Sequence, residues 1–417
     1  MHGAGTKTAI TTARDFPAII DITRLTSRVG RGPYTGVDRV ELAYLEWCLA
    51  TDPDLFGLAK LSDGFVLLDR GGLSAFHQKL TGQVVWGKRD LRALVGLKTP
   101  APRGAAESDL RRLALRKFSD IPAAFRNFVP KGCRYLNIGH SNLSERVLAG
   151  FARAEIAPVV FLHDVIPFEF PQFQRAGTAE AFSKKLVAMK EHAHCIITNS
   201  QDSLSKARAA LDGRDRGMHF AHLGIDVPDN IMDVSRLNRP HFVTLGTIEP
   251  RKNHALLLEV WRDLEDHFSE EYLPDLHIIG QRGWENRDVI TKLEALKDHP
   301  RIHEHNTMSD ADMWPLVAGS HGLLFPSHAE GFGLPSLEAA ALNVPVVCGD
   351  LAIHRELLGD YPVYANVNDR YLWQKTIIEQ AEKRLEDLRD ACAKNTPHIP
   401  TWDEHFVRVN GAVMGST

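Results

Sequence analysis

Short apolar runs alternate with longer amphipathic stretches along most of the chain. The first half has such runs at residues 18–22, 135–138, 159–162 and 195–198. Each is followed by a segment whose apolar positions recur at helical spacing: residues 37–50, 144–154, 178–192 and 201–211. Strands that alternate with helices are typical of parallel βαβ units. The pattern therefore predicts an α/β fold with a doubly wound parallel sheet.

The same alternation resumes in the second half, beyond a polar stretch at residues 226–240 that suits an interdomain linker. Strands are predicted at residues 241–245, 276–279, 301–305 and 322–327. Helices are predicted at residues 253–267, 285–296, 310–318 and 335–343, and from residue 401 onward. We therefore expect three parts: a first domain over residues 1–236, a second over residues 237–398, and a terminal helix within residues 399–417.

The bulk composition narrows the class of protein. A chain of 417 residues can bury two separate cores, and its formal net charge of −4 argues against a nucleic-acid partner. No apolar run reaches the roughly 18 residues of a membrane span, and the start lacks the plan of a signal peptide. We expect a cytoplasmic protein with no metal site. Its scattered cysteines form no C-x-x-C pair and favour free thiols: Cys48, Cys133, Cys195, Cys348 and Cys392.

The most informative motif runs from Glu330 to Glu338, Glu-Gly-Phe-Gly-Leu-Pro-Ser-Leu-Glu. It joins a predicted strand to a predicted helix, and Pro335 suits the first helical turn because its missing N–H has no intrahelical partner to lose there. Free amides at a helix N-terminus favour an anion, and the two carboxylates can accept hydrogen bonds from hydroxyl groups. The combination suits a sugar nucleotide. The alternative is an ordinary helix start flanked by two acidic residues.

A second motif, Gly246-Thr-Ile-Glu-Pro-Arg-Lys-Asn253, also lies between a predicted strand and a predicted helix. Its Arg251 and Lys252 can neutralise a diphosphate, Arg as a fork of donors and Lys as a mobile point charge. The alternative is a solvated surface pair. The sequence has no G-x-G-x-x-G fingerprint and no G-x-x-x-x-G-K-[ST] loop, which disfavours NAD enzymes and P-loop kinases.

Together the two motifs resemble the retaining glycosyltransferases of family 4, which have the two-domain GT-B fold. His163-Asp164-Val-Ile-Pro167 and Ile197-Thr-Asn-Ser200 support the likeness, which covers nearly the whole chain and is strongest between residues 241 and 358. The resemblance implies two Rossmann-like domains facing a cleft, with the C-terminal helix crossing back onto the first domain. It is specific for the fold and the reaction type, not for the sugar.

The resemblance also implies roles for the second domain. Glu338 is expected to accept the ribose hydroxyls of the donor, and Glu330 to contact the transferred sugar without acting as a nucleophile. Arg251 and Lys252 are expected to stabilise the departing diphosphate without a metal. In front-face transfer the leaving phosphate would deprotonate the acceptor. Further contacts to the donor are expected from the loop residues Gly246, Gly331, Phe332, Gly333 and Leu334.

The first domain supplies fewer candidates. His163 follows a predicted strand end, where ligands bind in parallel sheets. The resemblance implies that His163 touches the donor sugar and that Asp164 orients the sugar or the nearby loop. Asn199 and Ser200 are equally well explained as acceptor-side residues or as a helix N-cap.

The N-terminal loop departs from the family pattern. Relatives often carry adjacent glycines where the chain nears the donor phosphates, whereas here Gly30, Gly32 and Gly36 are separate. Gly36 is expected to fill that place at the donor, and Arg39 to reach an anion or the acceptor. The alternative is a plain turn followed by a salt bridge within a helix.

Residues 109–131 interleave basic and apolar side chains. A basic amphipathic stretch can lie on an anionic membrane surface, which would suit an enzyme that extends a lipid-linked glycan at the inner face of the membrane. The alternative is a helix whose leucines and phenylalanines pack on the sheet while its basic residues rim it.

The resemblance implies a retaining, metal-independent glycosyltransferase that needs no cofactor. It would move a hexose or deoxyhexose from a nucleotide diphosphate sugar, with GDP preferred and UDP open, to a growing lipid-linked surface glycan such as O-antigen or capsule. The second motif is most like bacterial mannosyl- and rhamnosyl-type members. One alternative is a sugar-nucleotide epimerase or hydrolase of the same fold, which needs no acceptor. Another is a non-catalytic sugar-nucleotide-binding protein, which would show no turnover.

Overall fold

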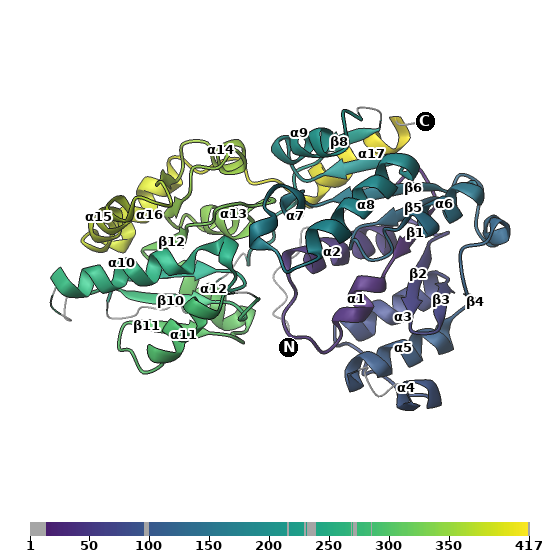
Figure 1. Ribbon diagram of the computed structural model, residues 1–417, viewed down its shortest axis with the longest axis horizontal. Helices are drawn as coiled ribbons and strands as arrows, with labels where there is room; N and C mark the ends of the chain where they lie inside the picture. The colour runs from purple at the N-terminus through teal and green to yellow at the C-terminus, as the bar shows by residue number, and fades with distance from the viewer. Residues whose placement is uncertain are drawn as a thin grey trace.

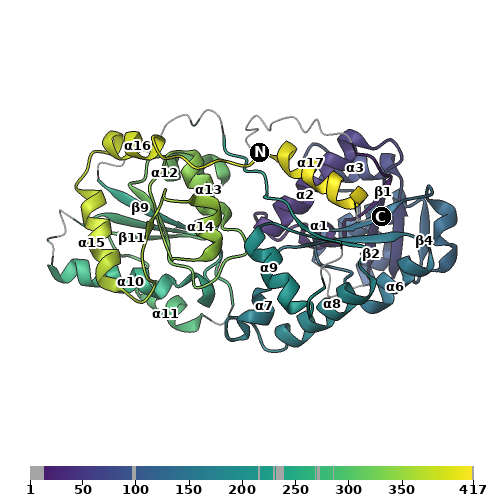
Figure 2. The same ribbon diagram turned by 90° about the horizontal axis from the view of Figure 1, so that it is seen from above.

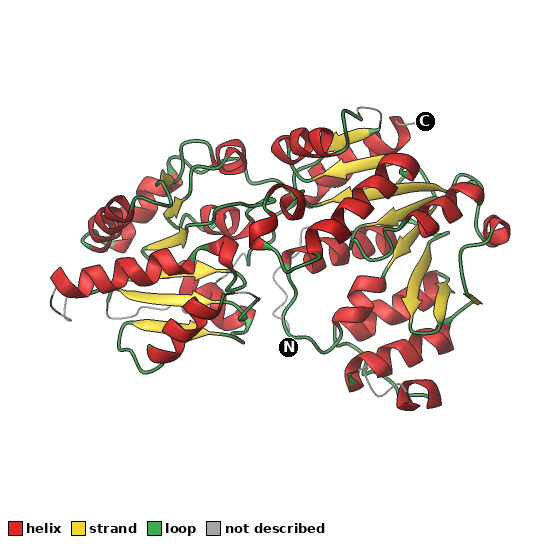
Figure 3. Cartoon of the chain, viewed as in Figure 1, coloured by secondary structure: helices red, strands yellow, loops and turns green. Residues whose placement is uncertain are grey.

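The computed structural model describes residues 14–95, 100–214, 217–228, 231, 239–267, 269, 273–284 and 286–415. Two α/β domains lie side by side, each with a central sheet between layers of helices (Figures 1 and 3). The predicted fold class, two Rossmann-like domains of the GT-B arrangement, is confirmed. The expected domain boundary at residues 236 and 237 and most of the predicted linker lie outside the described residues.

The first domain is built on an eight-stranded sheet in the order β4-β3-β2-β1-β5-β6-β7-β8. Its core lies on both faces of the sheet, because strands such as β1 bury every residue. The strands are β1 (Ala18–Asp21), β2 (Phe56–Leu61), β3 (Gly64–Leu68), β4 (Arg116–Phe118), β5 (Arg134–Asn137), β6 (Ala157–Leu162), β7 (Cys195–Thr198) and β8 (Met218–Phe220).

One edge of this sheet differs from the predicted all-parallel order. Strand β2 pairs with β1 in parallel, but β2–β3 and β3–β4 are antiparallel. The reason is local: Leu61 pairs with Gly64 across a two-residue turn, and Gly64 has a φ of +129° that favours glycine. A turn this short allows only an antiparallel return.

The helices of the first domain begin where polar side chains can cap them. In α2 the Thr35 hydroxyl accepts from the Asp38 amide while the Asp38 carboxylate accepts from the Thr35 amide, a capping box. The α-helices are α1 (Thr23–Arg28), α2 (Gly36–Thr51), α3 (Arg70–Leu80), α4 (Leu91–Val95), α5 (Ala101–Leu113), α6 (Glu145–Arg153), α7 (Ile166–Glu169), α8 (Thr178–His192) and α9 (Gln201–Ala210). Two 3₁₀ turns are η1 (Ala123–Phe128) and η2 (Pro171–Phe173).

The second domain has a six-stranded, wholly parallel sheet in the order β11-β10-β9-β12-β13-β14. Its strands are β9 (His241–Leu245), β10 (Asp275–Ile279), β11 (Ile302–His305), β12 (Gly322–Phe325), β13 (Val346–Cys348) and β14 (Val363–Tyr364). Its helices are η3 (Pro250–Lys252), α10 (His254–His267), α11 (Arg287–Ala295), α12 (Asp310–Ala318), α13 (Leu334–Ala341), α14 (Ala352–Leu358), α15 (Arg370–Ala381) and α16 (Leu385–Ala393).

The last helix, α17 (Trp402–Gly415), returns to the first domain and packs against β7 and β8 (Figure 2). Its Phe406 ring stacks on Trp47 of α2 with centroids 4.3 Å apart, and His405 Nε2 lies 2.9 Å from the Tyr44 hydroxyl. These contacts fasten the end of the chain across the domain junction. None of the helices that the structure describes combines the length and the apolar character needed to cross a bilayer.

Candidate functional site

The charged residues of the two sequence motifs meet in one cluster. Lys252 Nζ lies 2.6 Å from Glu330 Oε1, and Arg251 Nη1 lies 2.9 Å from Glu330 Oε2. The cations come from η3, after β9, whereas the carboxylate comes from the loop after β12, the neighbouring strand. Because both strands are parallel, their carboxyl ends meet at one edge of the sheet. We call Arg251, Lys252 and Glu330 the second-domain cluster.

The second-domain cluster keeps its charges although it is buried. Burial alone would raise the pKa of Glu330, but the positive charges of Arg251 and Lys252 outweigh it and lower that pKa to about 2. Burial lowers the pKa of Lys252, opposed by Glu330, whereas Glu330, Glu249 and Asp164 raise the pKa of Arg251. The result is a fixed pair of cations on an ionised carboxylate.

Packing fixes the position of the lysine. Its Nζ lies 4.4 Å from the centre of the Phe325 ring, a cation–π contact. Its side chain also passes Gly246, which has a φ of +136°, and a Cβ on that glycine would lie 3.2 Å from Lys252 Cε. Glycine is therefore required at 246 both for the backbone angle and for room.

The turn between the two glutamates delivers a helix N-terminus to the same place. Gly333, the N-cap of α13, has a φ of +83°, and among the described residues no side chain caps it. A Cβ there would lie 3.4 Å from His354 Nε2 and 3.2 Å from Ser336 Oγ. The helix N-terminus is thus free of a side-chain acceptor and suits an anion.

Glu338 lies one turn into α13 and faces the other domain. Its carboxylate is 4% exposed and lies 2.5 Å from Nη1 of Arg39 in α2. A Cβ on Gly36, the first residue of α2, would lie 3.2 Å from Leu334 Cδ1. From the sequence, Arg39 is expected to reach an anion or the acceptor, or else to form a salt bridge within its helix. The structure instead pairs it with a carboxylate of the second domain, so the beginnings of α2 and α13 meet.

His163 and Asp164 lie at the carboxyl end of β6. His163 Nε2 is 2.8 Å from the Ile138 carbonyl, and burial lowers the pKa of the ring to about 4, so the ring is neutral near pH 7. Asp164 lies against Gly331 of the second domain: a Cβ atom added to this glycine would be only 2.9 Å from Oδ2 of Asp164. Burial raises the pKa of Asp164, opposed by Arg251.

The structure separates the roles of Asn199 and Ser200. The Ser200 hydroxyl accepts from the Ser203 amide at 3.0 Å and is the N-cap of α9. Asn199 is not a cap: its Nδ2 donates to the His163 carbonyl at 2.7 Å. Asn199 therefore holds the strand end that carries His163.

Sequence reasoning missed a group of buried polar residues in the first domain. Asp21, at the end of β1, accepts hydrogen bonds from the Tyr135 hydroxyl at 2.5 Å and from Asn142 Nδ2 at 2.7 Å. Glu41 of α2 is fully buried, and burial followed by the nearby Asp21 raises its pKa well above the ordinary value. His163 contacts the Ile138 carbonyl, and a Cβ on the next residue, Gly139, would meet Glu41 Oε2. We call Asp21, Glu41 and His163 the first-domain cluster. An acidic residue at a strand end was the available signal for Asp21.

A second missed feature holds the domains together. Glu356 of α14 accepts from the backbone amides of Gln201 and Asp202, each at 2.8 Å, at the N-terminus of α9. The same carboxylate lies 2.7 Å from His222 Nε2. Nearby, the Ser203 hydroxyl donates to the Gly331 carbonyl at 3.2 Å. No motif in the sequence marks Glu356, because its partners belong to the other domain.

Residues 109–131 form three short elements, not one helix: the end of α5, β4 and η1. Leu110 and Phe125 are fully buried, and the rings of Phe118 and Phe125 lie 5.1 Å apart. The Arg111 guanidinium lies 2.6 Å from Asp90. Leu110 and Phe125 therefore pack inward, as the second of the two alternatives expects, whereas Leu115 is exposed.

Residues 230–398 match the model of the family described as glycosyl transferases group 1. Among curated proteins, the chain is 29% identical over 233 residues to the Escherichia coli serotype-specific mannosyltransferase WbdA, covering 49% of this chain and 27% of that protein. It is 25% identical over 251 residues to the Salmonella typhimurium O-antigen chain mannosyltransferase RfbU, covering 58% of this chain and 65% of that protein. The chain thus spans less than two thirds of each relative.

The fold is similar to that of a solved structure over almost its whole length. The crystal structure of Anabaena Alr3699/HepE in complex with UDP and glucose superposes with a TM-score of 0.61 at 15% identity, covering 96% of this chain and 99% of that one. At this identity the likeness establishes the fold alone.

Proposed function

We propose that this protein is a retaining glycosyltransferase of surface-polysaccharide assembly. It moves a hexose or deoxyhexose, with mannose preferred, from a nucleotide diphosphate sugar to a growing, lipid-linked glycan. The observation that carries the proposal is the second-domain cluster: two cations fixed on one carboxylate, beside the open N-terminus of α13. The names of the two mannosyltransferase relatives support the sugar class and the setting.

The geometry suits a departing diphosphate. Transfer leaves extra negative charge on the phosphate that was bonded to the sugar, and preorganised cations and amide dipoles stabilise that charge where water is excluded. Arg251, Lys252 and the amides of the Gly331–Leu334 turn are the proposed donors. Glu330 then holds both cations in place and contacts the sugar hydroxyls. Each oxygen of Glu330 already pairs with one cation, which favours front-face transfer over attack by this carboxylate.

Donor binding is expected to exchange one ion pair. Glu338 now pairs with Arg39 across the domains. To accept the ribose hydroxyls, Glu338 must release or share that cation, and Arg39 becomes available to the phosphates or the acceptor. The loss of the pair is offset because both charged groups gain new partners.

The first-domain cluster suits a neutral acceptor. The lowered pKa of His163 leaves its ring uncharged at neutral pH, and burial raises the pKa of Glu41, so both residues are suited to hydrogen bonds with hydroxyls. The proposed proton acceptor for the attacking hydroxyl is the leaving phosphate, with no protein base and no metal in the reaction.

A panel of sugar nucleotides tests the proposal. A bound donor raises the midpoint of thermal unfolding by mass action, so GDP-mannose should raise it more than UDP- or dTDP-sugars do. A larger thermal shift with UDP-glucose would overturn the preference for a GDP-linked donor but would leave the proposed glycosyl transfer standing. No shift with any sugar nucleotide would overturn the function itself.

Product analysis separates the alternatives. The transferase should release nucleotide diphosphate only with a glycan acceptor, keep the anomeric configuration of the sugar, and retain its rate in EDTA. Turnover without an acceptor would favour an epimerase or hydrolase. Tight donor binding with no turnover on any surface-glycan acceptor would favour a binding protein.

A further inference from the structure

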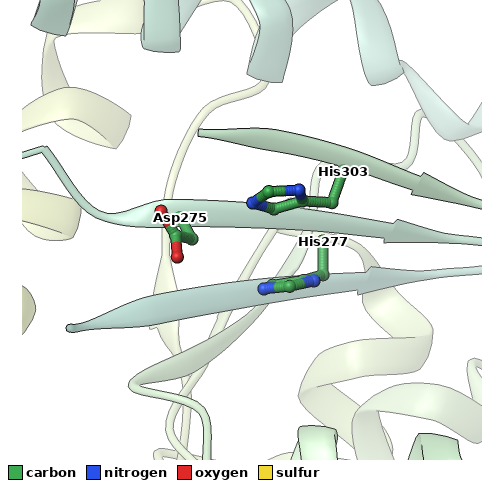
Figure 4. A group of neighbouring side chains, drawn as sticks. All are labelled: Asp275, His277 and His303. Carbon is green, nitrogen blue, oxygen red and sulfur yellow. The ribbon is translucent and has the colours of Figure 1, made fainter. Parts of the chain in front are cut away.

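A group of metal-ligand side chains lies on the second sheet, outside the site described above. Asp275 and His277 stand two residues apart on β10, and so project from the same face of the sheet. His303 of β11 is the register partner of His277. One ligand atom from each residue, a carboxylate oxygen and two ring nitrogens, lies within 4.8 Å of the other two. Figure 4 shows the two imidazole rings one above the other, with the carboxylate beside them.

The central histidine has an unused nitrogen. His277 is 7% exposed, and its Nδ1 lies 3.0 Å from His305 Nε2. Its Nε2 is buried and has no hydrogen-bond partner among the residues that the structure describes. A buried polar atom without a partner costs free energy. If Nδ1 of His277 carries the proton and donates a hydrogen bond to His305, Nε2 presents a lone pair toward the Asp275 carboxylate. A cation bound between this lone pair and the carboxylate removes the free-energy cost of the unpartnered nitrogen.

The surroundings favour one kind of ion. Two imidazoles and one carboxylate suit Zn²⁺, whereas Mg²⁺ and Ca²⁺ prefer oxygen ligands alone. Bonds of about 2.0–2.1 Å imply ligand atoms about 3.4 Å apart in a tetrahedron. The three ligand atoms lie within 4.8 Å of one another, so binding asks the side chains to approach by at most about 1.4 Å. Arg301 is the competing cation: its Nη1 lies 3.4 Å from Asp275 Oδ1, which leaves the second oxygen for a metal.

We propose that Asp275, His277 and His303 bind one divalent transition-metal ion of the Zn²⁺ class. His305 is a positioning residue, because its contact with His277 Nδ1 fixes which nitrogen faces the ion. The ion would join the edge strand β11 to β10. A cavity of about 370 Å³ beside β11, lined in part by His303 and His305, offers a route from solvent.

The position argues for a structural role. Asp275 is the first residue of β10, whereas Gly246 and the second-domain cluster follow the last residues of parallel strands. The metal would therefore stabilise the domain from the amino ends of its strands and take no part in sugar transfer.

The test uses the full chain, stripped with chelator and titrated with Zn²⁺ and with Co²⁺. One ion per chain should bind, Co²⁺ should give the visible absorption of a four- or five-coordinate site, and Zn²⁺ should raise the midpoint of thermal unfolding by a few degrees. His303→Gln and Asp275→Asn should each weaken Zn²⁺ binding at least about 100-fold, and His305→Ala about 10- to 100-fold. His398→Ala is the control: it removes an exposed histidine from the segment that follows α16 and should leave Zn²⁺ binding unchanged.

Each outcome decides the question. Circular dichroism and the unfolding midpoint of the stripped variants establish that they fold. Equal Zn²⁺ affinity in His303→Gln and His398→Ala would mean adventitious binding to surface histidines and would overturn the proposal, as would the absence of stoichiometric binding. Donor-induced thermal shifts of the stripped protein report on the proposed function separately, so the two proposals fail independently.

Discussion

The two clusters at the domain junction handle buried ionisable groups in opposite ways. In the second-domain cluster every charge has an opposite charge within 2.9 Å, and Glu330 stays ionised to a pKa of about 2. In the first-domain cluster burial is the leading influence: it raises the pKa of Glu41 and lowers that of His163 to about 4, so the His163 ring is neutral near pH 7.

The difference shows what burial does to an ionisable group. A charge survives inside a protein only when its partners repay the lost hydration, and otherwise the group changes its protonation state. Under the proposed function, the contrast separates two tasks. The second-domain cluster stabilises an anionic leaving group, and the first-domain cluster binds an uncharged, hydroxyl-rich acceptor.

The largest effect is expected from Lys252→Met. The variant removes a cation that would face the leaving phosphate, so kcat should fall by about 10²- to 10³-fold, with a smaller change in donor affinity. Steady-state kinetics with the donor found by the thermal-shift panel measures this. Lys252→Met also removes one of the two cations that neutralise the buried charge of Glu330. The control is therefore the double variant Lys252→Met with Glu330→Gln. This double variant should regain stability but not rate; full recovery of kcat would show that the lysine acts only on folding.

Two matched substitutions to glutamine test the comparison directly. Glu330→Gln breaks a buried ion pair and should lower the free energy of unfolding by about 3–5 kcal/mol. Burial raises the pKa of Glu41, which favours the neutral carboxyl, and glutamine is a neutral group of similar shape. The cost of Glu41→Gln should therefore be smaller, within about 1 kcal/mol. Urea unfolding of both variants at pH 7 measures the two values. Equal costs would mean that Glu41 is ionised in the folded protein.

Glu338→Gln should weaken donor binding about 10- to 100-fold, because hydrogen bonds to a charged acceptor contribute about 1.5–3 kcal/mol. Calorimetric titration with the sugar nucleotide measures this. Arg39→Met is the control, since it removes the cross-domain partner of Glu338 and keeps the carboxylate. The donor affinity of Arg39→Met should be equal or tighter if the released Arg39 turns to the acceptor, and weaker if it binds the donor phosphates. An unchanged affinity in Glu338→Gln would remove this residue from the nucleotide site.

The clusters should lose stability in different pH ranges. The folded pKa of His163, about 4, lies below its ordinary value of 6.5. As the pH falls, His163 is protonated in the unfolded chain before it is protonated in the folded protein. Its contribution to the free energy of unfolding, complete above pH 6.5, is therefore lost as the pH falls toward 4, by up to about 1.4 kcal/mol per pH unit. The folded pKa of Glu330, about 2, lies below its ordinary value of 4.5. The contribution of ionised Glu330 to the free energy of unfolding is therefore lost only as the pH falls from 4.5 to about 2.

His163→Gln separates this effect from the titration of other histidines. Unfolding free energies of the wild type and the variant, measured between pH 7 and pH 4, should diverge because only the wild type loses this contribution. Parallel curves would show that the His163 ring is not held neutral in the folded state.

Several features of the site could be predicted from the sequence because they are local. The strand–turn–helix pattern around Arg251 and Lys252 and around Glu330 placed both motifs at carboxyl ends of parallel strands, and their side chains do meet. The antiparallel β2–β3 pair was missed, because a two-residue turn was not recognised between two apolar runs.

What the sequence determined by itself is the alternation of buried strands and amphipathic helices, and hence the fold and the loops that carry charge. Only the tertiary structure decided which distant side chains pair: Arg39 with Glu338 across the domains, and His277 with His303 across a strand register. The physical reason is that periodicity and turn chemistry act over a few residues. Pairing across domains and strands depends instead on how the packed elements finally lie against one another.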